Sequence, residues 1–199
     1  MSPSTDELRA SLTEAAVALA AFSEDEAAVS ATAEFSSLAL EALRGGKKLL
    51  ACGNGGSMCD AMHFAEEWTG RFRGDRAALP ALAFSDPAQL TCIANDFGFA
   101  EVFARQIAAH GREGDVLVAL STSGESPNIL RALEEARARG IKTVGLLGRG
   151  GGAARELADV AIVVPAAATS DRIQEVHIKV LHAVIEAVER QLFPETGSE

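Results

Sequence analysis

The feature that most constrains the fold is an alternation that begins near residue 47 and continues almost to the end of the chain. Five short apolar runs lie at 48–52, 81–84, 116–120, 143–147 and 160–164, with helical patterns at about 57–70, 86–109, 126–139, 151–158 and 170–193. Runs that are apolar throughout are typical of strands covered on both faces. The alternation predicts an α/β fold with a doubly wound, mostly parallel five-stranded sheet and helices on both faces.

The first 45 residues have a different pattern, typical of two helices. Ser4 with Glu7 has the spacing of a capping box, and Ser23 with Glu26 repeats that signal. A pair of glycines near residue 45 is expected to end the second helix. We therefore divide the chain into an N-terminal helical extension expected to contribute to oligomerisation, a sheet domain and a tail, at 1–45, 46–193 and 194–199.

Length and charge limit the classes of protein to which the chain can belong. Its 199 residues suit one domain, and its 18 basic and 28 acidic residues give 18 − 28 = −10, which argues against a broad nucleic-acid-binding face. No apolar run approaches the ~20 residues that a bilayer span needs, and the first residues do not resemble a signal peptide. The three cysteines lack CxxC spacing and suit reduced thiols. We expect a cytoplasmic protein that binds neither membranes nor nucleic acid.

A glycine-rich loop at 53–57 follows the first predicted strand and precedes a helix. Glycines let backbone N–H groups approach a ligand closely, and a helix start adds unpaired N–H groups and partial positive charge. Met58 breaks the GxGxxG fingerprint, and no Lys-Ser or Lys-Thr pair follows as in a P-loop, so no nucleotide cofactor is expected. Taken alone, the loop is equally compatible with a turn that binds nothing.

A hydroxyl-rich loop follows the third predicted strand and is the stronger candidate for an anion site. Ser126 before Pro127 is a natural N-cap, but capping does not need Ser121, Thr122 or Ser123. Hydroxyls and helix N–H groups together suit a phosphate, whereas a GxSxG nucleophile would need glycine at position 121. The two loops hold few basic residues and no Asp-rich Mg²⁺ site. This favours binding of a phosphorylated metabolite over phosphoryl transfer.

Two helices carry groups that can move protons or hold a metal. His63 and Glu67 are i and i+4 on the helix after the glycine-rich loop, a pair compatible with a metal site, an oriented base or a surface ion pair. On the last helix, Gln174 and His182 are about 80° apart and can line one face. His177 lies about 140° from His182, so the two histidines are not expected to serve one site.

Together these segments resemble the sugar isomerase (SIS) domain and, within it, the phosphoheptose isomerase family. The matching segments are 53–57, 63–67, Arg71, 95–98, 121–124, Ser126 and 172–182. By itself the serine-rich loop indicates only the superfamily, whereas its combination with Glu67, Gln174 and His182 is far more specific. Asn95 and Asp96 belong to these segments, although a simple turn explains that pair equally well.

The resemblance implies a flavodoxin-like fold, a homotetramer with active sites between subunits, and an aldose–ketose isomerase acting on sedoheptulose 7-phosphate in heptose biosynthesis. It implies that the phosphate and nearby hydroxyls bind to Ser57, Ser121, Thr122, Ser123 and Ser126. The rest of the sugar would contact Asn54, Gly55, Gly56, Glu67, Arg71, Asn95, Asp96 and Gln174. Glu67 and His182 would be the acid/base pair. Some members bind Zn²⁺ through residues matching His63, Glu67, Gln174 and His182.

Rival functions remain open at the level of the sequence. A related SIS protein binds the bacterial replication initiator as a tetramer and need not keep Glu67 and His182, whose joint presence favours the isomerase. Isomerisation of another phosphosugar is the alternative at the level of the substrate. A sugar-sensing regulator would need an added DNA-binding domain, and an amidotransferase would need a glutaminase domain.

Overall fold

A five-stranded parallel sheet forms the centre of the computed structural model, which describes residues 4–165 and 169–194. The strands are β1 (Leu49–Gly53), β2 (Ala81–Ala83), β3 (Val116–Ser121), β4 (Lys142–Leu147) and β5 (Val160–Val163). They lie in the order β2-β1-β3-β4-β5, and every neighbouring pair is parallel. The predicted doubly wound sheet is confirmed. The tail expected at 194–199 lies outside the described residues except for Pro194.

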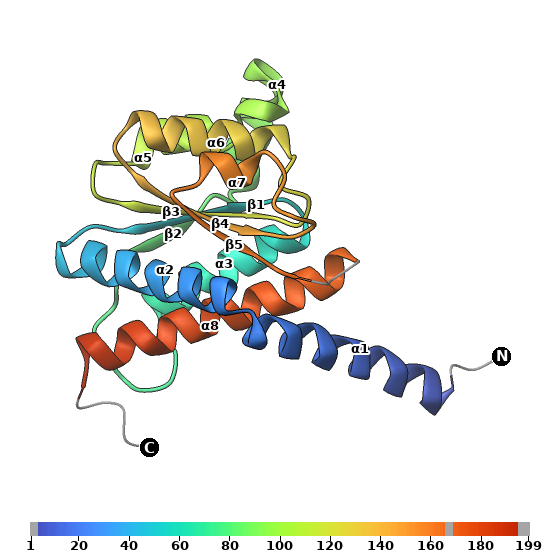
Figure 1. The fold of residues 1–199 in the computed structure, drawn as a ribbon. Helices are drawn as coiled ribbons and strands as arrows, with labels where there is room; N and C mark the ends of the chain where they lie inside the picture. The colour runs from blue at the N-terminus through green and yellow to red at the C-terminus, as the bar shows by residue number, and fades with distance from the viewer. Residues whose placement is uncertain (1–3, 166–168, 195–199) are drawn as a thin grey trace.

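Helices cover both faces of the sheet (Figure 1). On one face lie α2 (Glu26–Arg44), α3 (Gly56–Thr69) and α8 (Ser170–Leu192), and α1 (Thr5–Glu24) extends from them away from the sheet. The other face carries α5 (Ala104–His110), α6 (Pro127–Ala138) and α7 (Ala154–Leu157), while α4 (Pro87–Phe97) projects beyond them and leads into the short helix η1 (Phe99–Glu101). Among the described residues, no helix is both long and apolar enough to cross a lipid bilayer.

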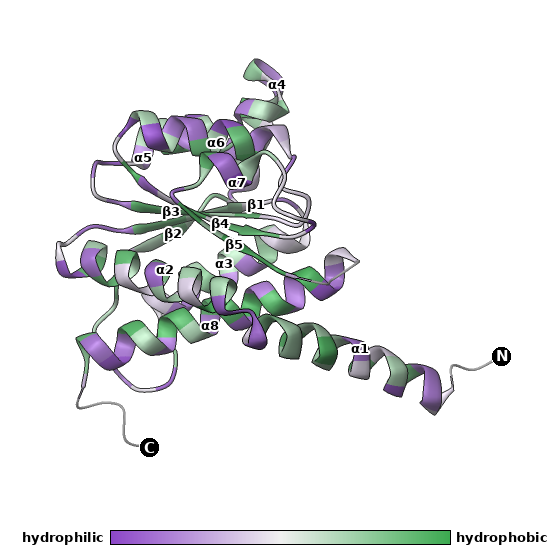
Figure 2. Ribbon diagram, viewed as in Figure 1, coloured by the Kyte–Doolittle hydropathy of each residue, from purple (hydrophilic) through white to green (hydrophobic). Residues whose placement is uncertain are grey.

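The strands separate two apolar layers, which explains why their sequences are apolar throughout. Leu49 and Ala51 of β1 face the layer that contains Phe64 and Trp68, whereas Leu50 and Cys52 face the opposite layer. Successive side chains of a strand point to opposite faces, so a strand with helices on both sides needs apolar residues at every position. Figure 2 shows this continuous hydrophobic band along the strands.

The N-terminal cap predicted from the sequence is confirmed for α1 but not for α2. Ser4 and Glu7 form the predicted capping box at the start of α1. The second helix is capped by Asp25 rather than Ser23, because the Asp25 carboxylate accepts the free N–H groups of Ala27 and Ala28. A carboxylate at this position satisfies two donors and complements the positive end of the helix.

The prediction of a single helix at 86–109 is wrong, because the first helix of this segment ends at Phe97. Gly98 adopts a φ of +89°, a conformation that favours glycine, and ends α4 before η1 and α5 begin. The helix expected at 151–158 is also shorter, because Gly150, Gly151 and Gly152 all have positive φ and α7 starts only at Ala154.

The strand order places the glycine-rich loop and the serine-rich loop side by side. β1 and β3 are neighbours, whereas β2 lies on the far side of β1, so the chain changes direction across the sheet between β1 and β3. In open α/β sheets, ligands bind at such a point, outside the carboxyl ends of the strands.

Candidate active site

The glycine-rich loop turns sharply from β1 into α3. A Cβ at Gly53 would lie 2.5 Å from the carbonyl oxygen of Ser57, so only glycine permits this close approach of strand and helix. Gly55 occupies the N-cap with a φ of +55°, and no side chain caps α3. The N–H groups of Ser57 and Met58 bond to the carbonyls of Asn54 and Gly55 in a tight first turn, and the positive end of α3 with no capping side chain over it suits an anion.

Two hydroxyls of the serine-rich loop shape the loop itself. The Oγ of Ser121, at the end of β3, accepts the N–H of Gly124 at 3.0 Å, and the Oγ of Ser123 accepts the N–H of Glu125 at 3.2 Å. A hydroxyl that accepts one hydrogen bond keeps its own proton for donation. Both side chains can therefore hold the loop and still donate to a ligand.

The other two hydroxyls of this loop have different surroundings. Ser126 occupies the N-cap of α6 with Pro127 at the first helical position, but its side chain makes no capping hydrogen bond. The capping role expected for this hydroxyl is therefore wrong, which leaves the side chain available for a ligand. Thr122 donates to the hydroxyl of Ser170 at 3.2 Å and so joins the loop to the start of α8.

A pair of asparagines joins the two loops. Asn54 donates from Nδ2 to Asn128 Oδ1 at 2.9 Å, and Asn128 donates from Nδ2 to Asn54 Oδ1 at 2.8 Å. Asn128 is buried in the first turn of α6, and no role is predicted for it from the sequence. In the sequence, its position two residues after the N-cap Ser126 is the signal that points to such a role.

Gln174 on α8 lies against the glycine-rich loop. A Cβ at Gly56 would lie 2.7 Å from its Oε1 and 2.8 Å from its Nε2, so the missing side chain at position 56 makes room for the amide. The start of α8 is thereby placed beside the start of α3.

Further along the same two helices, three predicted residues converge. His63 Nε2 lies 2.9 Å from His182 Nε2 and 3.3 Å from Glu67 Oε1. One potential ligand atom from each residue lies within 4.8 Å of the others. Two imidazole nitrogens and a carboxylate oxygen are a donor set that Zn²⁺ accepts, so the residues fit the metal implied by the resemblance.

The surroundings of this cluster favour the neutral forms of Glu67 and His182. Burial, followed by the nearby carboxylate of Glu66, raises the pKa of Glu67. Burial, followed by the neighbouring His63, lowers the pKa of His182. A carboxylate with a raised pKa is a stronger proton acceptor than an ordinary one, which suits abstraction of a proton from carbon.

His177 lies away from this cluster, in agreement with the helical spacing. Its ring is fully buried, and Nε2 lies 3.3 Å from the carbonyl oxygen of Leu147 at the end of β4. Burial lowers the pKa of His177 to about 4. The residue is therefore a neutral part of the core.

Three other predicted residues are exposed on a single chain. Arg71 follows the end of α3, and Asn95 and Asp96 lie in the last turn of α4, a helix without buried residues. Asn95 donates to the carboxylate of Asp96 at 2.7 Å. The fold of one chain thus joins the two loops to each other and gathers His63, Glu67 and His182 on α3 and α8. It leaves Arg71, Asn95 and Asp96 at the surface, where their roles stay predictions.

Comparisons with known proteins identify the family. Residues 12–148 match the family model of the SIS domain. A phosphoheptose isomerase from Vibrio cholerae serotype O1 is 50% identical over 187 residues, which cover 94% of this chain and 98% of that protein. The chain belongs to the phosphoheptose isomerase family. Another phosphoheptose isomerase, from Fusobacterium nucleatum, is 55% identical over 150 residues, covering 75% of this chain and 77% of that protein.

Solved structures of phosphoheptose isomerases have the same fold as this member of the family. The enzyme from Neisseria gonorrhoeae superimposes with a TM-score of 0.86 at 39% identity, covering 92% of this chain and 97% of that chain. The enzyme from Francisella tularensis gives a TM-score of 0.88 at 33% identity, covering 95% and 100%. The likeness extends beyond the SIS match and includes α8, the helix that carries Gln174 and His182.

Proposed function

We propose that this phosphoheptose isomerase family member converts sedoheptulose 7-phosphate into D-glycero-D-manno-heptose 7-phosphate, the first step towards nucleotide-activated heptoses in the cytoplasm. The observation that carries the proposal is the convergence of His63, Glu67 and His182 on α3 and α8, two helices that begin beside the strand ends where the two candidate phosphate-binding loops meet. Similarity to phosphoheptose isomerases over nearly the whole chain supports it.

The chemistry needs few groups, and the site supplies them. The serine-rich loop and the starts of α3 and α6 bind the phosphate, whose binding energy positions the reacting carbons. Glu67 takes a proton from one carbon and returns it to the next through an enediol, while His182 moves protons on the carbonyl and hydroxyl oxygens and assists ring opening. Asn54, Gln174 and, from the surface, Arg71, Asn95 and Asp96 contact the sugar hydroxyls.

We propose a metal site at His63, Glu67, Gln174 and His182. A Zn²⁺ bound there supplies a Lewis acid that polarises sugar oxygens. Metal analysis of the purified protein, with and without chelator, tests occupancy. Turnover after chelation then shows whether the metal is needed for the reaction. If activity is lost and zinc restores it, the metal is required. If activity is unchanged, the metal-bound protein is a resting form.

We also propose that the chain assembles into a homotetramer. Leu8, Leu12 and Val17 on α1 are 59%, 73% and 62% exposed, an apolar content that a partner subunit would cover. A second subunit would also complete the site around Arg71, Asn95 and Asp96. Light scattering at micromolar concentration should give about four times the 20.7 kDa of one chain, and a monomer would contradict the proposal.

The decisive experiment is a comparison of substrates. Turnover of sedoheptulose 7-phosphate is measured beside fructose 6-phosphate, ribulose 5-phosphate and arabinose 5-phosphate. We expect the highest kcat/KM with the heptose. Preference for another phosphosugar would change the substrate assignment, and no turnover of any of them would favour the non-catalytic binding protein.

A further inference from the structure

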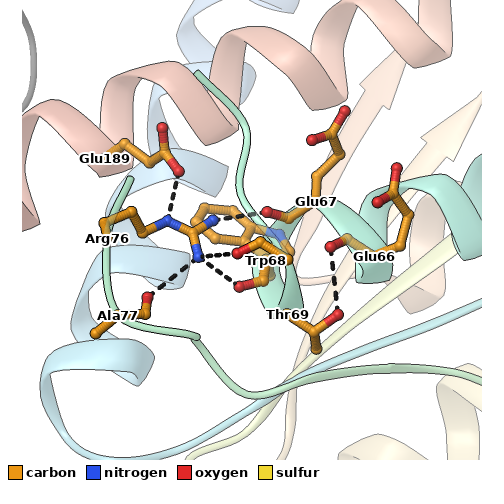
Figure 3. A network of polar contacts seen from close by, with 8 residues as sticks. Glu66, Glu67, Trp68, Thr69, Arg76, Ala77 and Glu189 are labelled. Carbon is orange, nitrogen blue, oxygen red and sulfur yellow. Dashed lines mark hydrogen bonds and ion pairs between the residues drawn. The ribbon is translucent and has the colours of Figure 1, made fainter. Parts of the chain in front are cut away.

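A buried guanidinium, that of Arg76, lies in the segment between α3 and β2, next to the turn that carries Glu67 of the His63, Glu67 and His182 cluster. The Arg76 side chain is only 1% exposed. A buried cation is costly unless it is paired and hydrogen-bonded, so its partners indicate what it holds in place. Figure 3 shows Arg76 between the end of α3 and the side chain of Glu189.

Most of the hydrogen bonds from Arg76 go to the end of α3. Nη2 donates to the carbonyl of Glu67 at 2.6 Å, and Nη1 donates to the carbonyls of Trp68 at 2.7 Å and Gly70 at 2.9 Å. The last carbonyls of a helix lack partners within the helix, and α3 has no basic residue in its own last turn. Arg76 therefore caps α3 from outside, at the turn that carries Glu67.

The remaining charge is paired with the other helix of the site. Arg76 Nε donates to Glu189 Oε1 at 2.6 Å, and the Glu189 side chain is 11% exposed. Glu189 follows His182 by seven residues, two turns along α8, so both lie on the same side of that helix. The pair thus ties the end of α3 to the helix that carries His182.

We propose that Arg76, paired with Glu189, is a positioning residue that holds the last turn of α3 against α8 and thereby keeps the Glu67 carboxylate opposite His182. The inference rests on the proposed isomerase function of that site. Arg76 acts through the backbone: Figure 3 shows the Glu67 carboxylate directed away from the guanidinium, which contacts the Glu67 carbonyl instead. A misplacement of about 1 Å at a reacting group can cost on the order of 10² in rate.

Arg76→Lys is the principal test. Lysine keeps the charge that Glu189 needs, but one ammonium cannot reproduce the planar fork that reaches several carbonyls at once. We expect kcat to fall by roughly 10²-fold with KM within a few-fold of the wild type, because the phosphate is held by the serine-rich loop and not by this turn.

Asp115→Asn is the matched control. The Asp115 carboxylate is 1% exposed and pairs at 2.6 Å with Lys48, which is 27% exposed, so Asp115 is also a buried charge with an ion-pair partner. This pair joins the starts of β1 and β3 and involves neither α3 nor α8. We expect this variant to lose stability, as Arg76→Lys does, without losing kcat. Equal losses of kcat in the two variants would reduce Arg76 to a general stabilising role and overturn the proposal.

Trp68 gives a second readout that needs no substrate. It is the only tryptophan of the chain, it is fully buried, and its carbonyl accepts a hydrogen bond from Arg76. If Arg76 holds this turn, the emission of folded Arg76→Lys should shift to longer wavelength while its far-UV circular dichroism stays unchanged. Asp115→Asn should keep the wild-type emission.

The two readouts separate this inference from the proposed function. If the wild type turns over no phosphosugar, the proposed function fails, and Trp68 emission still tests whether Arg76 holds the turn. Unchanged emission and unchanged kcat in folded Arg76→Lys, or a raised KM with normal kcat, would overturn the inference. If Arg76→Lys does not fold, Glu189→Gln carries the same test, because it keeps the volume and an oxygen that accepts from Arg76 but removes the charge.

Discussion

The Nε2 atoms of His63 and His182 lie 2.9 Å apart, although 119 positions separate the two residues in the chain. At this distance one ring donates its N–H to the lone pair of the other. The contact joins α3 to α8 and places His182 next to the Glu67 carboxylate, which lies 3.3 Å from the same His63 nitrogen.

Glu67→Gln should lower kcat by roughly 10²-fold or more and leave KM nearly unchanged, because the amide keeps the shape but cannot take a proton from carbon. His182→Ala should behave similarly. Steady-state kinetics with sedoheptulose 7-phosphate measure both. Glu66→Gln changes the adjacent, exposed carboxylate and should cost far less. Full activity of Glu67→Gln on every phosphosugar tried would end the acid/base assignment.

Ser126→Ala should weaken phosphosugar binding without lowering stability. Its side chain makes no capping hydrogen bond, so the folded chain loses little, whereas a hydrogen bond to a phosphate dianion contributes about 1.5–3 kcal/mol. Calorimetric titration should show at least a tenfold weaker Kd. Ser121→Ala should weaken binding and also lower the melting temperature, since Ser121 holds the N–H of Gly124. Unchanged affinity in folded Ser126→Ala would remove this hydroxyl from the phosphate site.

Gly56→Ala should disturb Gln174 more than it disturbs the fold. The new Cβ would lie 2.7 Å from the end of a flexible side chain that can move away. We expect kcat/KM to fall while the melting temperature stays close to that of the wild type. Gly124→Ala is the contrast, because its Cβ would lie 1.9 Å from the carbonyl oxygen of Gly151 at a φ of +68°, which should destabilise the loop strongly. Normal kinetics of Gly56→Ala would mean that the position of Gln174 does not matter for turnover.

His177 should make the stability of the protein depend on pH between about 6.5 and 4. The folded state lowers the pKa of this buried imidazole to about 4 from an ordinary 6.5, so the unfolded chain binds more protons in that interval. Its contribution is complete above pH 6.5 and is lost progressively as the pH falls, to a total of about 3 kcal/mol.

Urea unfolding at a series of pH values tests this expectation, with His177→Gln as the comparison. Glutamine does not titrate and can still donate to the carbonyl of Leu147. The variant should show a flatter dependence of its unfolding free energy on pH over this interval. Identical slopes for the two proteins would show that other groups cause the acid sensitivity.

Local patterns were enough to predict the architecture and to indicate the two loops and two helices that carry the candidate site. Strands apolar at every position require helices on both faces, and the alternation with helices requires parallel connections. Helical spacing alone separated His177 from the face shared by Gln174 and His182. Local patterns failed where two neighbouring residues could each end or begin a helix. Asp25 rather than Ser23 caps α2, and Gly98 divides the helix expected at 86–109.

The sequence by itself determined the sheet, its helices and the two loops, because strand and helix periods and turn residues act over a few neighbouring positions. Only the tertiary structure decided the contacts between distant side chains. Asn54 with Asn128, His63 with His182, and Arg76 with Glu189 are separated by 74, 119 and 113 positions. A single sequence carries no periodic signal for such pairs, since they form only when packing of α3, α6 and α8 on the sheet brings their backbones together.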